Sequence, residues 1–149
     1  MKSFLTLTAL AALCNSAYCF REGTYQIGSA RLEYTKVLTE VPGQEDLVFK
    51  TVTGHPGQIW DFTLTDEEDY FLVTNTLGAY IDCPALDSLC TAGEDPTSYR
   101  LEIVADNTYE LVANGTGYFL RLADDNKLKL AGYGPGPEQE FILTEASEA

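Results

Sequence analysis

The stretch GHPGQIWDF, residues 54–62, contains the only Trp and the only His of this 149-residue chain. The Gly and Pro residues at its start predict a loop. Trp60, Phe62 and Leu64 then alternate with polar residues, and alternation with a period of two places every second side chain on the same face of a β-strand. The stretch therefore predicts a loop followed by a core strand, with Trp60 buried.

Two imperfect copies of this strand occur later in the chain, and each of the three follows an opening strand that contains a Tyr. The closing strands are QIWDFTL (58–64), TSYRLEI (97–103) and EQEFILT (138–144). The opening strands are GTYQI (23–27), EDYFLV (68–73) and NTYELV (107–112), with Tyr at 25, 70 and 109. Recurrence at steps of about 40 residues is the mark of a repeat architecture.

Each unit also contains two further strand candidates between its opening and closing strands. The second strands are GSARLEY (28–34), GAYIDC (78–83) and GYFLRL (117–122), and the third are DLVFKTV (46–52), DSLCTA (87–92) and KLKLAGY (127–133). No segment after the first 19 residues has helical spacing over a useful length. The sequence therefore predicts an all-β domain with repeats at about 23–66, 67–106 and 107–145.

Three units of four short strands resemble the β-trefoil, in which six strands form a barrel and six form a hairpin cap with pseudo-threefold symmetry. The alternative is a β-sandwich in which the Tyr spacing is accidental. The motif Gln58-Ile59-Trp60 is similar to the Gln-x-Trp signature of the ricin-B-type lectins. Its copies keep less of the signature, as Gln139-Glu140-Phe141 and Thr97-Ser98-Tyr99.

The lectin resemblance implies carbohydrate binding by an early Asp, an aromatic residue and amides in each repeat. In the three units, the residues that we align with this Asp are Glu33, Asp82 and Arg121. Only the second unit therefore keeps the family residue. No unit carries a complete set, and an inherited galactose specificity is not expected. The carbohydrate-binding candidates are Glu33, Gln58, Asp82, Asp124, Asn126, Tyr133 and Gln139.

The strand GTYQI and the incomplete sugar residues also resemble the fungal β-trefoil protease inhibitors, such as the mycocypins. These proteins present an exposed loop to a protease. The candidate loops are PGQED (42–46), CPALDSLC (83–90) and GYGPGPEQ (132–139). A third possibility is a secreted effector that uses the trefoil only as a scaffold.

The first 19 residues have the features of a secretory signal peptide. Lys2 precedes an apolar run at residues 4–13 and small residues near 17–19. Cleavage after residue 19 leaves one domain, 20–149, whose two remaining cysteines we expect to form a Cys83–Cys90 disulfide in an oxidising compartment. In a secreted chain the sequon at Asn114 is a candidate glycosylation site.

The predicted mature chain has 8 basic and 23 acidic residues, which gives a formal charge of −15. Such a charge disfavours nucleic acids and anionic membranes as partners. Two Cys and one His cannot make a structural zinc site, and no cofactor is expected. No nucleophile motif accompanies His55, so we expect no enzyme. The expected partner is a glycan or an extracellular protein such as a protease, and the expected state is a monomer.

Overall fold

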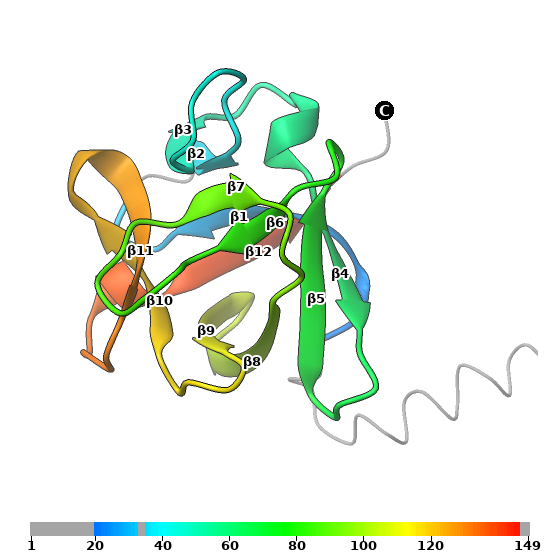
Figure 1. Ribbon diagram of the computed structural model, residues 1–149, viewed down its shortest axis with the longest axis vertical. Coiled ribbons are helices and arrows are strands. Elements are labelled where there is room, and N and C mark those ends of the chain that lie inside the picture. The colour runs from blue at the N-terminus through cyan, green and yellow to red at the C-terminus, as the bar shows by residue number, and fades with distance from the viewer. Residues whose placement is uncertain (1–19, 33–34, 147–149) are drawn as a thin grey trace, which may run out of the picture.

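The computed structural model describes residues 20–32 and 35–146 (Figure 1), which form an almost entirely β structure. The expected signal peptide, with Cys14 and Cys19, and the candidate Glu33 lie outside these residues. The first unit has β1 (Gly23–Ser29), β2 (Lys36–Thr39), β3 (Val48–Thr51) and β4 (Trp60–Leu64). The second has β5 (Tyr70–Asn75), β6 (Tyr80–Asp82), β7 (Thr91–Gly93) and β8 (Ser98–Ala105). The third has β9 (Thr108–Ala113), β10 (Phe119–Ala123), β11 (Lys127–Ala131) and β12 (Phe141–Glu145).

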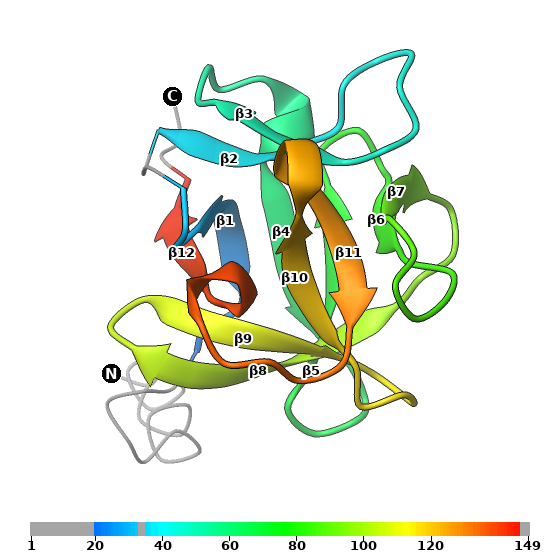
Figure 2. The ribbon, with the colours of Figure 1, turned by 90° about the vertical axis from the view of Figure 1, so that its left-hand side faces the viewer.

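The first and fourth strands of the three units close into a six-stranded antiparallel barrel. The ring of pairings runs β1–β4–β5–β8–β9–β12 and returns to β1. The second and third strands pair with each other as the hairpins β2–β3, β6–β7 and β10–β11 (Figure 2). This is the predicted arrangement of three four-stranded units with pseudo-threefold symmetry, and it excludes the sandwich.

The closing aromatic residue of each unit lies in the core. Trp60, Tyr99 and Phe141 each have 1% of their surface exposed or less. The Trp60 indole Nε1 donates to the Leu38 carbonyl at 3.1 Å, and the Tyr99 hydroxyl donates to the Ile81 carbonyl at 3.0 Å. The prediction that Trp60 is core is confirmed, and these two bonds tie β4 and β8 to the hairpins of their own units.

The buried face of β4 is shorter than the alternation predicts. Phe62 is 1% exposed, but Leu64 is 48% exposed. Leu64 is the last residue of β4, and the turn to β5 follows at once. Leu64 therefore lies on the same face as Trp60 and Phe62, as the alternation predicts, but it is not buried.

The opening aromatic of the second unit is Phe71 rather than the predicted Tyr70. Phe71 pairs with Tyr99 in the same register in which Tyr25 pairs with Trp60 and Tyr109 pairs with Phe141. Phe71 is 6% exposed, whereas the Tyr70 side chain is only half-buried. A one-residue difference in register moves a side chain to the opposite face of a strand. Phe71 therefore enters the core in place of the predicted Tyr70.

Phe20 packs on the equivalent aromatic rings of all three units. Its ring centroid lies 4.8 Å from that of Tyr25, 5.1 Å from Phe71 and 5.3 Å from Tyr109. It also lies 5.3 Å from Phe62, so four barrel rings contact it. Contacts with all three repeats place Phe20 near the pseudo-threefold axis, where it covers the end of the barrel core.

The second strand of the first unit begins later than predicted. After Ser29 the chain turns, and the Leu32 amide donates to the Ser29 carbonyl at 3.1 Å. Residues 30–32 therefore do not continue the strand predicted at 28–34, and β2 is the second strand of this unit. Leu38 in β2 accepts from Trp60 as Ile81 in β6 accepts from Tyr99. The residue equivalent to Asp82 is thus Thr39, and the alignment of Glu33 with Asp82 is wrong.

The predicted disulfide between Cys83 and Cys90 is present. The loop that it closes does not project freely from the second unit. The Asp87 amide donates to the Leu130 carbonyl at 2.6 Å, the Leu130 amide to the Ser88 carbonyl at 3.1 Å, and the Cys90 amide to the Leu128 carbonyl at 2.8 Å. The bridged loop, residues 83–90, is therefore attached along β11 of the third unit (Figure 1).

Candidate functional site

A hollow of about 520 Å³ opens on the outer face of the β10–β11 hairpin. The tight turn η2 (Asp124–Asn126) closes one end of it, and the 3₁₀ turn η3 (Pro137–Gln139) contributes another wall. The lining residues are Leu89, Arg121, Leu122, Ala123, Asp124, Asp125, Lys127, Lys129 and Glu138. We call this hollow the third-repeat hollow.

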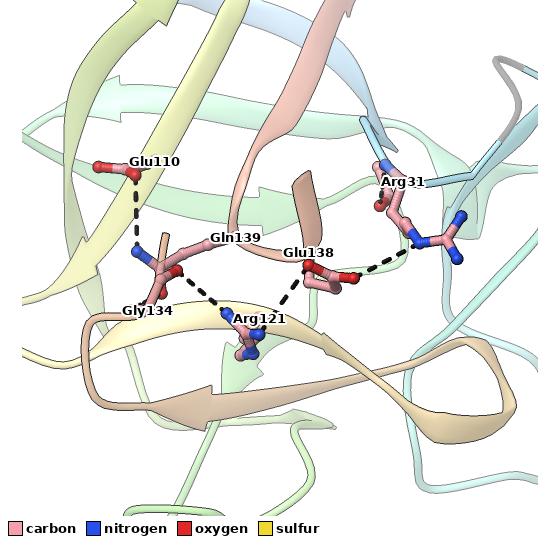
Figure 3. A network of polar contacts seen from close by, with 7 residues as sticks. Arg31, Glu110, Arg121, Gly134, Glu138 and Gln139 are labelled. Carbon is pink, nitrogen blue, oxygen red and sulfur yellow. Dashed lines mark hydrogen bonds and ion pairs between the residues drawn. The ribbon is translucent and has the colours of Figure 1, made fainter. Parts of the chain in front are cut away.

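Arg121 is held in place by groups that come from η3 and the loop before it (Figure 3). Its Nη1 donates to the Gly134 carbonyl at 3.2 Å, and its Nη2 lies 3.9 Å from Glu138 Oε1. The other oxygen of Glu138 lies 3.4 Å from Arg31 Nε in the first unit. Glu138 therefore lies between two guanidinium groups, which limits its freedom and leaves part of Arg121 facing the hollow.

The charges around the hollow are mixed. Arg121 and Lys129 lie directly opposite each other on β10 and β11, which is unfavourable for two cations unless other charges compensate. Glu138 compensates Arg121, and Lys127 Nζ lies 3.1 Å from Asp46 Oδ2 of the first unit. Hydrogen-bond donors and acceptors thus face the same small volume, as a ligand rich in hydroxyl groups requires.

Gln139 anchors the loop beneath Arg121 and has no exposed surface of its own. Its Oε1 accepts from the Gly134 amide at 2.9 Å, and its Nε2 donates to Glu110 Oε2 at 3.5 Å (Figure 3). Burial raises the pKa of the Glu110 carboxyl, and the hydrogen bond from Gln139 partly opposes this rise. Gln139 therefore positions Gly134, whose carbonyl in turn accepts from Arg121.

Gln58 has the equivalent position in the first unit and makes more bonds. It is 2% exposed. Its Oε1 accepts from the amides of Thr53 at 2.8 Å and Gly54 at 3.0 Å, and its Nε2 donates to the Thr51 carbonyl at 2.9 Å and to Thr39 Oγ1 at 3.2 Å. The structure thus gives the glutamines of both motifs a loop-holding role, and any contact with a ligand stays a prediction.

The remaining sugar-binding candidates do not all meet at one place. Asp124 lines the third-repeat hollow, and Asn126 ends the η2 turn at its edge without lining it. Tyr133 is 65% exposed and packs edge-on against Phe119 with ring centroids 5.3 Å apart, outside the lining. Asp82 lies in the second unit on β6. Of the described carbohydrate-binding candidates, only Asp124 therefore lines the hollow.

Asp82 lies against the backbone of the neighbouring strand. A Cβ built on Gly93 of β7 would lie 2.6 Å from the Asp82 carboxylate, so only glycine leaves room for this side chain. Tyr80 and Gly93 are paired directly on the two strands. Whether this carboxylate contacts a sugar stays a prediction.

Sequence reasoning missed several residues of the hollow, namely Leu89, Lys127, Lys129 and Glu138. The motifs FLRL and KLKL alternate apolar and basic residues, so a hairpin between them gathers the cations on one face. That signal was available in the sequence. The contribution of Leu89 was not, because it depends on the pairing of the bridged loop with β11.

His55 and Asn114 are both engaged in local hydrogen bonds. His55 Nδ1 accepts from the Gly57 amide at 2.9 Å and caps the turn before Gln58. Asn114 Nδ2 donates to Glu67 Oε1 at 2.9 Å and to Ser98 Oγ at 3.0 Å. Use of the sequon at Asn114 stays a prediction.

No metal centre is found among the residues that the structure describes, since no three His, Cys, Asp or Glu side chains group together there. Within the same residues no helix has the length and apolarity needed to cross a membrane.

Solved structures with the same fold include fungal lectins. The Macrolepiota procera ricin B-like lectin in complex with lactose has a TM-score of 0.73 and 18% identity, over 86% of this chain and 99% of that one. The Rhizoctonia solani agglutinin has a TM-score of 0.73 and 14% identity, over 88% and 100%. These likenesses establish the fold: the chain is a β-trefoil of the form found in ricin B-like lectins.

Enzymes also contain this fold. An endo-β-galactosidase from Clostridium perfringens that releases GlcNAcα1-4Gal matches with a TM-score of 0.70 and 13% identity, over 83% of this chain but only 32% of the enzyme. No protein-family model matches the sequence, and no curated protein matches it. The fold is therefore shared by lectins and by one part of a larger glycosidase.

Proposed function

We propose that this chain is a secreted, non-enzymatic protein that binds a glycan at the third-repeat hollow. The observation that carries the proposal is the convergence of Arg121, Lys129 and Glu138 with apolar side chains in one open hollow. Sugar hydroxyls donate and accept hydrogen bonds, while the C–H groups of the ring need apolar contact. Lectins with the same fold, one of them in complex with lactose, support a glycan as the ligand class.

The proposal that the chain is not an enzyme is supported by the place of its single histidine. The imidazole of His55 accepts a hydrogen bond from a backbone amide and caps a turn. The Ser-His-Asp and Cys-His arrangements need a histidine that is free to act as the base of the nucleophile. A binding role needs no such group, and the mixed charges of the hollow suffice for it.

The test is a glycan array followed by titration calorimetry with wild type and two arginine variants. Arg121→Ala should weaken binding by about tenfold or more, because a charged hydrogen-bond donor is lost from the site. Arg100→Ala is the matched control, since Arg100 lies on β8 and pairs with Glu102 outside the hollow. Absence of glycan binding at millimolar saccharide by folded wild-type protein would refute the proposal, as would equal affinities of both variants.

A second candidate function is protease inhibition through the bridged loop. Residues 84–87 at its tip are all exposed, and Leu86 is 44% exposed. The disulfide and the bonds to β11 restrict the loop, which lowers the entropy that binding would cost. Micromolar protein should then slow serine, cysteine or legumain-type proteases, and Leu86→Ala should relieve that effect. Unchanged rates for all three protease classes would remove this candidate.

A further inference from the structure

Leu89 is the one lining residue of the third-repeat hollow that comes from another repeat. It belongs to the bridged loop of the second unit, whereas the other lining residues lie between positions 121 and 138. Its side chain is 36% exposed. An exposed leucine at the wall of a hollow is available for contact with whatever fills it.

The backbone of the bridged loop fixes where this side chain points. Leu89 forms an antiparallel bridge with Lys129 of β11, and Lys129 is paired in turn with Arg121 of β10. Directly opposite residues of antiparallel strands place their side chains on the same face. Leu89, Lys129 and Arg121 therefore form a row across the outer face of the hairpin.

The same loop is secured at both ends. Cys90 is fully buried, and its backbone amide donates to Leu128 while its carbonyl accepts from the Leu47 amide at 3.0 Å. Cys83 is joined to Cys90 by the disulfide, so the segment between them cannot separate far from β11. Without that bond, only the backbone hydrogen bonds to β11 would keep the tip of the loop in place.

The hollow needs this apolar side chain because the rest of its wall is mostly charged. Among the described lining residues six are charged and none is aromatic. A pyranose presents hydroxyl groups at its edge and C–H groups on its faces, so a site made of charges alone would leave those faces without contact. Leu89 and Leu122 are the larger apolar side chains that remain.

We propose that the bridged loop of the second repeat completes the saccharide site of the third repeat. Leu89 contacts the apolar face or a methyl group of the bound sugar, and the Cys83–Cys90 disulfide acts as a positioning element for Leu89. The site is therefore a composite of two repeats, and its affinity depends on the oxidation state of the two cysteines. This inference rests on the proposed function.

The first experiment compares Leu89→Ala with Leu86→Ala, using the best saccharide found on the array as the probe in calorimetry. Leu86 lies in the same loop and is similarly exposed, but it does not line the hollow. Leu89→Ala should weaken binding by about fivefold, as expected for the loss of a small apolar contact, while Leu86→Ala should leave it unchanged. Equal affinities for wild type and Leu89→Ala would overturn the inference while leaving glycan binding intact.

The second experiment tests the disulfide by a double-mutant cycle. The Cys83→Ser/Cys90→Ser variant should bind more weakly than wild type, and adding Leu89→Ala to it should cost little more. If the disulfide only stabilised the domain, its removal would lower the melting temperature and leave the affinity of the folded protein unchanged, and that result would overturn the positioning role. Additive losses in the folded protein would overturn the positioning role, and the single Leu89→Ala variant keeps the inference testable if the serine variant does not fold.

Discussion

Replacing Gln58 by Leu should separate the structural role of the Gln-x-Trp motif from a role in ligand binding. Gln58 is 2% exposed, so the new side chain enters a buried position of similar volume. The change removes three bonds that its carbonyl oxygen accepts and two that its amide nitrogen donates. No large cavity is created, and the loss of stability reports the hydrogen bonds.

The expected loss follows from the number and surroundings of these bonds. A well-placed hydrogen bond contributes about 1 kcal/mol net, and the groups left behind are two backbone amides, one carbonyl and two hydroxyls, one of which was bonded only at 3.4 Å. Thr53 and Gly54 lie in an exposed loop, where water replaces part of what is lost. We therefore expect the free energy of unfolding to fall by about 3 kcal/mol, a large part of the 5–15 kcal/mol typical of a domain.

Urea denaturation followed by fluorescence measures this change directly, because the only Trp of the chain is fully buried in the core. Gln139→Leu is the matched comparison: its amide makes two bonds instead of five, so it should lose about half as much. Gln44→Leu, at an exposed position, should change the midpoint little.

Glycan affinity of the folded Gln58→Leu protein should equal that of wild type, because the third-repeat hollow lies in another unit. Two results would refute this reasoning. One is a loss of stability below about 0.5 kcal/mol, the range of ordinary surface substitutions. The other is a loss of glycan binding without a loss of stability, which would make Gln58 a ligand contact.

Two further predictions concern the aromatic core. Phe20→Ala should lower the free energy of unfolding by about 2–3 kcal/mol, because four aromatic contacts at the end of the barrel are lost. An unchanged melting temperature would show that Phe20 does not cover the core. Burial, and to a lesser extent Asp82, raises the pKa of the Tyr99 hydroxyl above its usual value of 10.0. As the pH rises, the Tyr99 hydroxyl therefore loses its proton in the unfolded chain before it does so in the folded protein. The free energy of unfolding has its full value below pH 10 and decreases as the pH rises further. Urea midpoints measured between pH 9 and pH 11 should fall less steeply for Tyr99→Phe than for wild type, and identical slopes would contradict this explanation.

Most of the fold was predictable because short-range patterns encode it. Alternating apolar residues and turn residues mark the strands that the structure describes, with the exception of β2, and the recurrence of a closing aromatic marks the three units. Trp60, Tyr99 and Phe141 are buried as their places in the repeat predict. The errors arose where a local pattern left the register open. Tyr70 and Phe71 are adjacent aromatics, and only the pairing with β8 decides which one enters the core.

The third-repeat hollow was much less predictable. Asp124 and Gln139 were candidates, and the structure places one on the wall and the other beneath it. The sequence predicted that the side-chain amides of Gln58 and Gln139 contact a ligand, because a sequence does not show that these side chains are buried. Whether an amide faces solvent or a loop backbone depends on the path of that loop in three dimensions.

By itself the sequence determined most of the strands, the threefold repeat and the disulfide, because residues close together in the chain specify them. Only the tertiary structure decided the composition of the site. Lys127 pairs with Asp46 across 81 residues, and the bridged loop of the second unit reaches β11 of the third. Closing the barrel brings these segments side by side, and no local pattern encodes which of their side chains then face the same hollow.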